Sequence, residues 1–599
     1  MRLWGAIPIL ASVAGALTLS SAARADSLAG KIVGEIKQDI KDELKDRDDG
    51  EHARDYKHIV IIYQENHSFD NLYGFWGNVG GDTIDGQSKA DAAHTNQVRQ
   101  DNQTAYSCLL QNDVNLTSPS PLQASCTDNT GPIAILSAFK NKPFEINDFI
   151  PPVATTCPKP VGAFASNGFL NGTGLPGGCT KDIVHRFYNE QYQINGGRQN
   201  RYVTGSDASG LSMGYYDTRK LPIYNYLHGH GAPNYVIADS FFQSAFGGTF
   251  LNHQFLVAAA PPPFGGALND GSANDFHSVV DPNGMPTSTP LYTSPLAAAK
   301  DAQLTASCQP PAGRPAVPAG LACGDFAVNT TQPFYQPFSP GTADARRLQP
   351  LTIANIGDRL SAGKVDWAWY SGGWSNANGD VGASGWTNGN GLVCSDPNHL
   401  VVKDSGGNVV NTFPNCPDVD FQFHHQAFNY YASYAPGTAA RKAHLRDEAE
   451  FIQAAKNGTL KAVSFIKPVG EENEHPGYTD ETDGSQHLVD LIKAVVEGPD
   501  GRDTLIIVTY DEFGGQWDHV PPPPHNRHGK DAQAADQWGP GTRIPALLVS
   551  KRFEKSGVAH DDYDTTSILK LIEERYNLAP LSSRDATVTN LKRALQVAQ

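Results

Sequence analysis

The sequence carries no excess of positive charge. Lys and Arg number 46 against 63 Asp and Glu, which leaves a formal net charge of −17 at pH 7. Because a general nucleic-acid-binding surface needs a basic footprint, this balance argues against nucleic acid as a partner. Beyond its first residues, the sequence also lacks any apolar run of the ~18 residues that a membrane-spanning helix needs, so we expect no integral membrane segment after processing.

The N-terminal segment is where an apolar run does occur. Arg2 provides a short positive region, residues 3–19 are largely apolar, and Ala23-Arg24-Ala25 is a small-residue cleavage pattern. These features predict a signal peptide over residues 1–25 and an exported protein, periplasmic or secreted, with an uncleaved anchor as the alternative. Residues 26–55 are dense in charge; an amphipathic helix and a solvated spacer both explain them, and we assign them no chemistry.

The C-x-x-C spacing of a zinc site is missing as well, although the chain has 8 cysteines. They lie in segments rich in Pro, Gly and Asn, and an even number in an exported chain indicates disulfide bonds. We interpret these bonds as staples for long loops. Closure of the shortest loops favours the pairs Cys108–Cys126, Cys157–Cys179, Cys308–Cys323 and Cys394–Cys416.

Short β-rich runs separated by long connections dominate the chain from residue 56 onward. Several lack strict alternation, as expected of strands covered on both faces, and segments 444–458 and 486–498 have helical spacing. The pattern predicts an α/β fold with a largely parallel central sheet, in one domain over 56–599 with loop or cap insertions around 75–180 and 260–350. The clearest runs are 58–63, 234–239, 365–373, 461–468, 504–512 and 544–550.

Two of these runs stop on polar pairs. HIVIIY (58–63) is followed by Glu65-Asn66, and TLIIVTY leads into Asp511-Glu512. Ligands of open α/β sheets bind beyond the carboxyl ends of the strands, so we expect both pairs at one edge of the sheet. Carboxylate and amide oxygens suit hard cations such as Mg²⁺, Ca²⁺ or Mn²⁺. The alternative is that each pair is a solvated turn.

A hydroxyl on a glycine turn is the third candidate element. In FGGTFLNH (246–253), Thr249 follows Gly-Gly at the start of an apolar segment. The N-terminus of a helix favours anions, which suits a nucleophile that must bind a phosphate before attacking it. Gly-Gly-Thr is also an ordinary helix N-cap, and that alternative stays open.

Histidines in polar segments punctuated by glycine or proline form the fourth element. His185, the pair His424-His425, and His475 in EENEHPG are candidates to line a cleft. A lone histidine is more often structural or exposed. The chain has no G-x-x-x-x-G-K-[ST] phosphate loop, which argues against a P-loop nucleotide enzyme.

Taken together, these motifs resemble a known family. ENHSFDNLYG (65–74), SMGYYDTRKLPIYNYL (212–227), FGGTFLNH, EHPGYTD (474–480) and YDEFGGQWDHVPPP (510–523) are similar to the bacterial phosphoesterase family of exported acid phosphatases and phosphatidylcholine-type phospholipases C. The resemblance runs from about residue 56 to about residue 580. It implies an alkaline-phosphatase-like α/β sandwich with helices on both faces of the sheet.

The resemblance also implies roles for the candidate residues. One divalent metal ion, with Mg, Ca, Mn and Zn all open, would be held by Glu65, Asn66, Thr249, Asp511 and Glu512. Thr249 falls at the nucleophile position, and a phosphothreonine intermediate is implied. Histidines charged at mildly acidic pH would clamp the phosphoryl oxygens: His185, His424, His425 and His475. Asp518 and His519 match the family motif and are possible members of a second shell around the metal.

The substrate is then a small phosphoester or a phospholipid. The chain has no Arg-Arg near its N-terminus, and FGGTFLNH is closer to the acid phosphatase branch, so we expect phosphomonoester hydrolysis. A phospholipase C acting on phosphocholine lipids is the alternative, which the Asp511-Glu512 pair favours. A catalytically silent surface-binding protein is the alternative of another class. A sulfatase would need a C/S-x-P-S-R context that the cysteines do not have. The sequence leaves the oligomeric state open.

Overall fold

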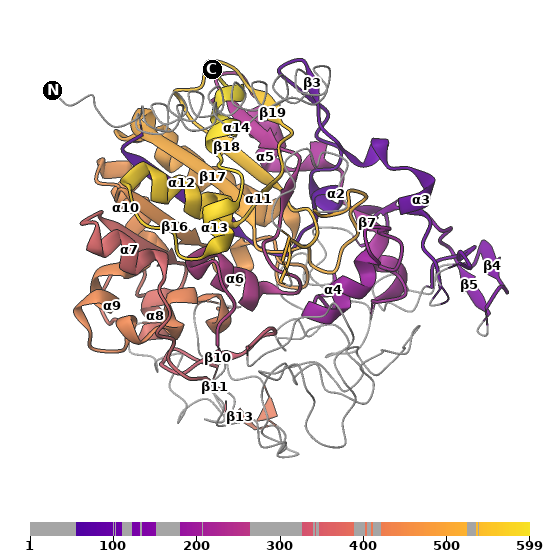
Figure 1. Cartoon of the computed structure of the whole chain (residues 1–599), viewed down its shortest axis with the longest axis horizontal. Coiled ribbons are helices and arrows are strands. Elements are labelled where there is room, and N and C mark those ends of the chain that lie inside the picture. The colour runs from indigo at the N-terminus through magenta and orange to yellow at the C-terminus, as the bar shows by residue number, and fades with distance from the viewer. Residues whose placement is uncertain are drawn as a thin grey trace, which may run out of the picture. The chain divides into compact units, whose positions relative to one another are not determined.

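The six β-rich runs found in the sequence form six strands of one eight-stranded sheet in the computed structural model, and β15 and β19 complete it (Figure 1). Every strand except β18 runs in the same direction, because β18 pairs antiparallel with both of its neighbours. The predicted α/β class and the largely parallel sheet are confirmed. In order across the sheet the strands are β15 (Leu445–Asp447), β12 (Trp367–Ser371), β16 (Val463–Lys467), β1 (His58–Gln64), β17 (Thr504–Tyr510), β18 (Ala546–Val549), β8 (Tyr235–Ala238) and β19 (Gly557–Ala559).

The structure describes residues 56–599 with gaps at 100, 102, 111–122, 132–133, 151–179, 207, 264–325, 340–341, 343–346, 389–401, 404–408, 411–417, 419–420, 524–534 and 537. The predicted disulfide Cys108–Cys126 is confirmed. The other three predicted pairs lie outside the described residues, as do the predicted signal peptide and the charged segment 26–55. Among the described residues, no helix has both the length and the apolar character needed to cross a membrane.

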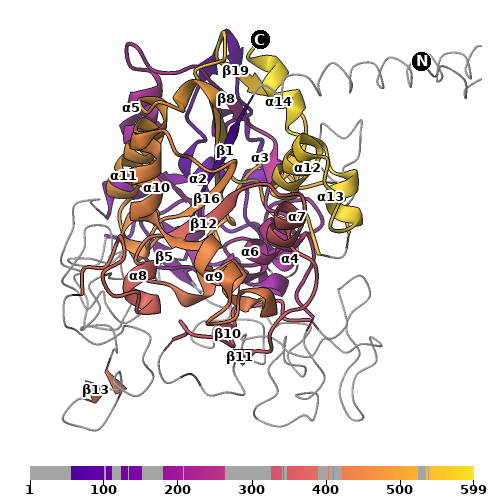
Figure 2. The ribbon, with the colours of Figure 1, turned by 90° about the vertical axis from the view of Figure 1, so that its left-hand side faces the viewer.

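Helices cover both faces of the sheet, as Figure 2 shows. On one face α11 (Glu481–Val496) packs against α5 (Pro222–Leu227) and α10 (Glu448–Asn457). On the other, α12 (Thr566–Tyr576) and α7 (Ile356–Ala362) both contact α6 (Thr249–Ala258). The central strands β1 and β17 are therefore buried on both sides, which explains why their sequences are continuously apolar.

The two helices expected from the sequence both exist, with shifted boundaries. The helix expected over 486–498 begins five residues earlier, because Asp480 caps it by accepting hydrogen bonds from the N–H groups of Thr482 and Asp483. The segment 444–458 divides into the edge strand β15 and helix α10, since Leu445–Asp447 pairs with β12 before Asp447 caps the helix.

Shorter elements connect these layers. The described part of 75–180 holds short hairpins, turns and single-turn helices, and most of 260–350 lies outside the described residues. The remaining helices are α2 (Phe69–Leu72), α3 (Ala92–Thr95), α4 (Phe187–Ile194), α8 (Trp374–Asn378), α9 (Ala439–His444), α13 (Ser583–Thr587) and α14 (Lys592–Val597). The remaining strands are β2 (Asn78–Val79), β3 (Asp82–Thr83), β4 (Cys126–Asp128), β5 (Ile135–Ser137), β6 (Phe144–Glu145), β7 (Gly214–Tyr215), β9 (Phe241–Phe242), β10 (Gln332–Pro333), β11 (Arg347–Leu348), β13 (Val402–Lys403), β14 (Val409–Val410) and β20 (Tyr563–Asp564).

Candidate active site

The polar ends of β1 and β17 leave the sheet side by side. The two strands are paired in register as far as Gln64 and Tyr510, so the residues that follow them start from adjacent positions. The backbone N–H of Asn66 donates a hydrogen bond to Asp511 Oδ1 at 3.0 Å. Asn66 has a φ of 62°, a left-handed conformation that Asn tolerates better than most residues. The expectation that both pairs share one edge of the sheet is thus met by the geometry.

Thr249 reaches the same place from another part of the chain. It is the first residue of α6, and its hydroxyl lies 3.2 Å from Glu65 Oε2, 3.3 Å from Asn66 Oδ1 and 3.4 Å from Glu512 Oε1. The turn before it needs glycine: Gly247 has a φ of 90°, and a Cβ there would lie 2.5 Å from the backbone nitrogen of Phe187. The hydroxyl therefore lies among three oxygen donors from two strand ends.

A buried carboxylate holds this turn in place. Glu190, on α4, accepts hydrogen bonds from the N–H of Gly247 at 2.5 Å and the side-chain amide of Gln243 at 2.9 Å. Its other oxygen accepts from the N–H and hydroxyl of Thr542 at 2.6 and 2.8 Å. Gln243 Oε1 in turn accepts from the N–H of Phe513 at 2.9 Å, next to Glu512. The Thr249 turn and the loop after β17 are thus braced against each other.

Three carboxylates in this group are fully buried: Glu65, Asp511 and Glu512. Burial raises the pKa of all three, and the charge of Asp511 further raises the pKa values of Glu65 and Glu512. One ammonium opposes them, because Lys467 Nζ lies 2.6 Å from Glu65 Oε1 and is itself fully buried. Three buried acids beside one base leave excess negative charge, which is costly unless a cation compensates it.

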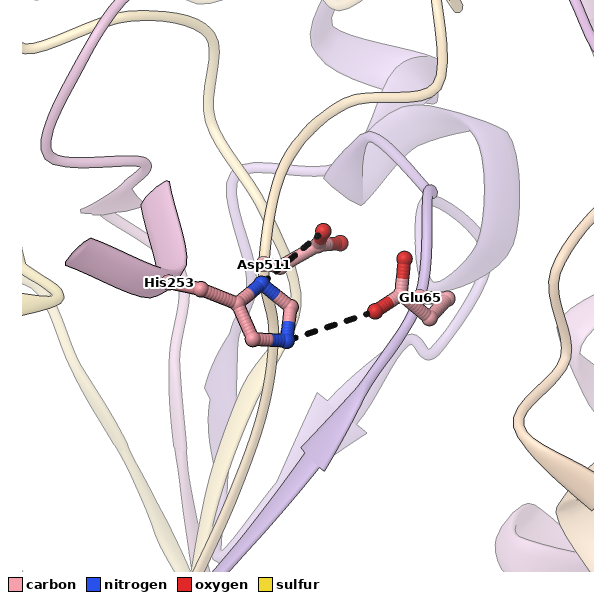
Figure 3. A group of neighbouring side chains, drawn as sticks. All are labelled: Glu65, His253 and Asp511. Atoms are coloured by element: carbon pink, nitrogen blue, oxygen red, sulfur yellow. Dashed lines mark ion pairs between the residues drawn. The ribbon is translucent and has the colours of Figure 1, made fainter. Parts of the chain in front are cut away.

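His253 lies between two of these carboxylates (Figure 3). Its Nε2 is 3.6 Å from Glu65 Oε1, and its Nδ1 is 3.8 Å from Asp511 Oδ2. One ligand atom from each of Glu65, His253 and Asp511 lies within 4.8 Å of the others. Among the described residues, neither His253 Nε2 nor Asp511 Oδ2 has a hydrogen-bond partner although both are buried. The unpartnered atoms and the uncompensated charge of the three carboxylates indicate that the cluster of oxygens around Thr249 fits a divalent cation.

The predicted histidines surround the same group. His185 Nε2 is 3.3 Å from Glu512 Oε1, and His475 Nε2 is 2.9 Å from Asn66 Nδ2. His425 Nδ1 lies 3.4 Å from Glu65 Oε1, and the ring of His424 packs edge-on against His425 at 4.5 Å. The structure therefore brings these four histidines and the five predicted metal-binding residues into one cluster.

Three of the surrounding rings are oriented in the same way. Nδ1 hydrogen-bonds a backbone carbonyl in His185 (Ile183 O, 2.5 Å), His475 (Pro476 O, 2.7 Å) and His253 (Thr249 O, 2.8 Å). Because a carbonyl only accepts, each Nδ1 carries the hydrogen, so each Nε2 facing the cluster can accept a hydrogen bond, as that of His475 does from Asn66 Nδ2, or take up a proton.

Burial disfavours the charged form of three of the four predicted histidines. Burial lowers the pKa of His424 to about 3 and holds the pKa values of His425 and His475 well below their ordinary range. Burial therefore favours the neutral form of these three imidazoles in the free protein, and their action as cationic clamps on a phosphoryl group stays a prediction.

Asp518 and His519 belong to a different network. Asp518 accepts from Arg543 Nε at 3.1 Å, and His519 Nδ1 lies 2.6 Å from Asp70 Oδ2. Arg543, fully buried, also pairs with Asp70 at 3.1 Å. These contacts tie the loop after β17 to α2, which follows Glu65-Asn66 in the chain. The network therefore stabilises the two loops that carry the candidate active-site residues.

A serine motif elsewhere in the chain has a structural explanation. Gly210-Leu211-Ser212-Met213-Gly214 has the G-x-S-x-G spacing of a hydrolase nucleophile turn. It lies in the 3₁₀ helix η4 (Ser209–Met213) rather than between a sheet strand and a helix, and the buried Ser212 hydroxyl donates to Ser209 O at 2.8 Å. Ser212 is thus part of the framework.

Comparison with known proteins decides the family. A model of the phosphoesterase family matches residues 166–579. The chain belongs to the phosphoesterase family. The matched range contains Thr249, the four predicted histidines and Asp511-Glu512, whereas Glu65 and Asn66 precede it. The chain is accordingly a hydrolase that acts on phosphoesters.

Curated relatives of this phosphoesterase are phospholipases C. A non-hemolytic phospholipase C of Burkholderia pseudomallei is 34% identical over 160 residues, 24% of this chain and 23% of that protein. Phospholipase C B of Mycobacterium tuberculosis is 22% identical over 566 residues, 90% of this chain and 77% of that protein. A solved structure of a protein in the alkaline phosphatase superfamily from Vibrio parahaemolyticus aligns with 39% of this chain and 51% of its own at 14% identity and a TM-score of 0.20.

Two site residues of this phosphoesterase were missed by sequence reasoning. His253 follows Thr249 by four residues on α6, and positions four apart share one face of a helix, so the quoted FGGTFLNH contained the signal. Lys467 ends the buried run of β16, the strand next to β1. A charged residue at the end of a buried strand was the available signal there.

Proposed function

We propose that this chain is a metal-dependent phosphoester hydrolase in which Thr249 is the nucleophile. The observation that carries the proposal is the position of the Thr249 hydroxyl, within 3.2–3.4 Å of oxygens from Glu65, Asn66 and Glu512 at the start of α6. A hydroxyl in this setting faces both the cation-binding oxygens and the positive end of a helix, where a phosphoryl group is stabilised.

The oxygens of Glu65, Asn66, Thr249, Asp511 and Glu512 would hold the ion. When bound, a divalent cation would lower the pKa of the Thr249 hydroxyl and neutralise charge on the phosphoryl oxygens. Asn66, anchored by its N–H to Asp511, presents its amide oxygen toward Thr249. The Glu190 and Gln243 brace holds the turn that aims the hydroxyl.

The chain also offers a route for the proton. Glu512 Oε1 lies 3.4 Å from Thr249 Oγ1 and 3.3 Å from His185 Nε2. As the threonine oxygen bonds to phosphorus, its proton passes by way of Glu512 to His185, which gives it to the leaving alcohol as the phosphorus–oxygen bond breaks. Water then attacks the phosphothreonine, gives its proton to His185, and the proton returns to the Thr249 oxygen as phosphate leaves.

For the substrate we propose phosphomonoesters, on the resemblance of FGGTFLNH to the acid phosphatase branch. The second candidate is phospholipase C activity on phosphocholine lipids, which the named relatives favour, one of them across 90% of this chain. Both reactions use the same nucleophile and metal donors. They differ in whether the phosphoryl group carries a second ester.

The test compares hydrolysis of p-nitrophenyl phosphate and p-nitrophenyl phosphorylcholine by wild type, Thr249→Ala and Thr249→Ser. We expect hydrolysis to disappear in Thr249→Ala and to survive in part in Thr249→Ser. When the wild-type reaction is stopped with acid, the peptide that contains Thr249 should carry one phosphoryl group. Thr587→Val, an exposed threonine, serves as the control. The ratio of the two activities assigns the substrate class.

Three outcomes would contradict the proposal. Full activity of Thr249→Ala would remove the nucleophile assignment. Activity that survives complete removal of metal by a chelator would remove the metal. Wild type inactive on both substrates, with and without added divalent metal, would favour the catalytically silent binding protein.

A further inference from the structure

Lys467 is a charged residue in an unusual place. It ends β16, its side chain is fully buried, and its ammonium lies 2.6 Å from Glu65 Oε1. The ammonium also donates to the backbone carbonyl of Tyr63 at 2.9 Å. A buried lysine lowers the stability of the fold unless its charge is paired. The contacts with Glu65 and with the end of β1 supply this pairing.

The two oxygens of Glu65 face different surroundings. Oε2 lies 3.2 Å from the Thr249 hydroxyl, on the side of the proposed metal donors. Oε1 faces Lys467, and it also lies 3.6 Å from His253 Nε2 and 3.4 Å from His425 Nδ1. Glu65 therefore bridges the proposed metal and a second group of donors.

This second group has the composition of a metal site of its own. It offers a carboxylate oxygen from Glu65, two imidazoles, and Asp511 Oδ2, which has no hydrogen-bond partner among the described residues. His253 and His425 are stacked with ring centroids 5.4 Å apart. Carboxylate and imidazole together suit Zn²⁺ or Mn²⁺. In this protein, however, the Lys467 ammonium is already in contact with the Glu65 oxygen that such an ion would use.

One divalent ion and one lysine are enough to neutralise the buried carboxylates. Glu65, Asp511 and Glu512 supply three negative charges, which one divalent cation and one ammonium together neutralise. A second divalent ion beside Lys467 would leave the buried group with a net charge of plus two. In an interior that excludes water, such an excess is costly.

We propose that Lys467 takes the place of a second metal ion, limits the site to one divalent cation, and covers a latent second site formed by Glu65, His253, His425 and Asp511. The inference rests on the proposed function, since it requires the first ion at Thr249. Removal of the ammonium leaves the four donors and removes one positive charge, so a second Zn²⁺ or Mn²⁺ should then bind.

The test counts ions bound to the full chain. Protein stripped by a chelator is titrated with Zn²⁺, and in a second series with Mn²⁺, and bound metal is measured after gel filtration. We expect one ion per chain for wild type and Lys467→Arg, and two for Lys467→Ala. Lys456→Ala, an exposed lysine, controls for loss of charge in general. Lys467→Ala combined with His425→Gln should return the count to one.

The outcomes separate this inference from the proposed function. No ion in wild type would overturn both. One ion in wild type and one in a folded Lys467→Ala would overturn only the role of Lys467. If Lys467→Ala fails to fold, Lys467→Met, which keeps the length of the side chain, replaces it. The number of ions in wild type also tests the inference, because two ions bound beside an intact Lys467 would overturn it.

Discussion

Asn66 donates its backbone N–H to Asp511 Oδ1 at 3.0 Å, across 445 residues of sequence. This bond links the ends of two adjacent parallel strands and sets the distance between the two polar pairs that follow them. It depends on a left-handed Asn66, with a φ of 62°. The backbone and the side chain of Asn66 thus have separable roles, one structural and one toward the cation.

Asn66→Gly should separate these roles. Glycine keeps the left-handed backbone and the bond to Asp511 but removes the amide oxygen near Thr249. We expect a melting temperature close to that of wild type, with metal affinity reduced at least about 10–100-fold, the range found when even an outer partner of a metal site is removed. Calorimetric titration of the stripped protein measures it. Asn577→Gly, at a φ of 53° after α12, is the matched control, and unchanged affinity in Asn66→Gly would contradict its role.

His185→Asn tests the proton route. If His185 Nε2 protonates the leaving alcohol, its loss should cost about 10²–10⁴-fold in kcat for an alkyl phosphate, whose leaving group needs the proton. In the first step alone, measured as the burst of alcohol released in a single turnover, the same variant should lose much less with p-nitrophenyl phosphate, because nitrophenolate leaves unprotonated. Paired rate measurements on the two substrates check this, with the exposed His230→Asn as control. Equal losses in this first step on both substrates would contradict the role of His185 as the acid for the leaving alcohol.

Glu190→Gln tests the brace behind Thr249. The carboxylate accepts four hydrogen bonds, and an amide in its place turns an NH₂ toward donors such as the N–H of Gly247 or Thr542. We expect a loss of about 1–3 kcal/mol in the free energy of unfolding, because a buried donor loses its acceptor. Since Thr249 is also displaced, kcat should fall while the metal count stays at one. Denaturant unfolding, kcat and metal content are measured for this variant and for the exposed control Glu554→Gln. An unchanged kcat would show that Glu190 is not needed to position Thr249.

His519 makes stability depend on pH. Burial lowers its pKa, but the charge of Asp70 and the hydrogen bonds to Asp70 and Asp85 outweigh burial and raise the pKa to about 9. A group whose pKa is raised on folding stabilises the fold fully below its unfolded value of about 6.5, and this contribution is lost as pH rises through about 9. The shift corresponds to about 3 kcal/mol.

His519→Gln removes this dependence. The free energy of unfolding of wild type should exceed that of the variant most at or below about pH 6.5, and the difference should shrink as pH rises through about 9. Denaturant unfolding across this range measures the difference, with the exposed His230→Gln as control. A difference that does not change with pH would contradict a charged His519.

Most strands of the sheet and the two polar strand ends could be predicted from the sequence. Continuous apolar runs predict buried strands, and polar residues at their ends predict a ligand edge, because both signals are local. Thr249 was found for the same reason, since a glycine turn followed by a helix is read from consecutive residues. The disulfide Cys108–Cys126 follows from short loop closure.

Features that depend on contacts between distant segments could be established only from the folded chain. Packing between segments far apart in the chain makes β18 antiparallel to its neighbours and brings both Lys467 and His253 to Glu65. It also pairs Asp518 with Arg543 and His519 with Asp70. Burial likewise sets the charge of the histidines, since desolvation depends on what surrounds a ring. The local sequence carries no record of these surroundings, so the location of the site could be predicted while its balance of charge could not.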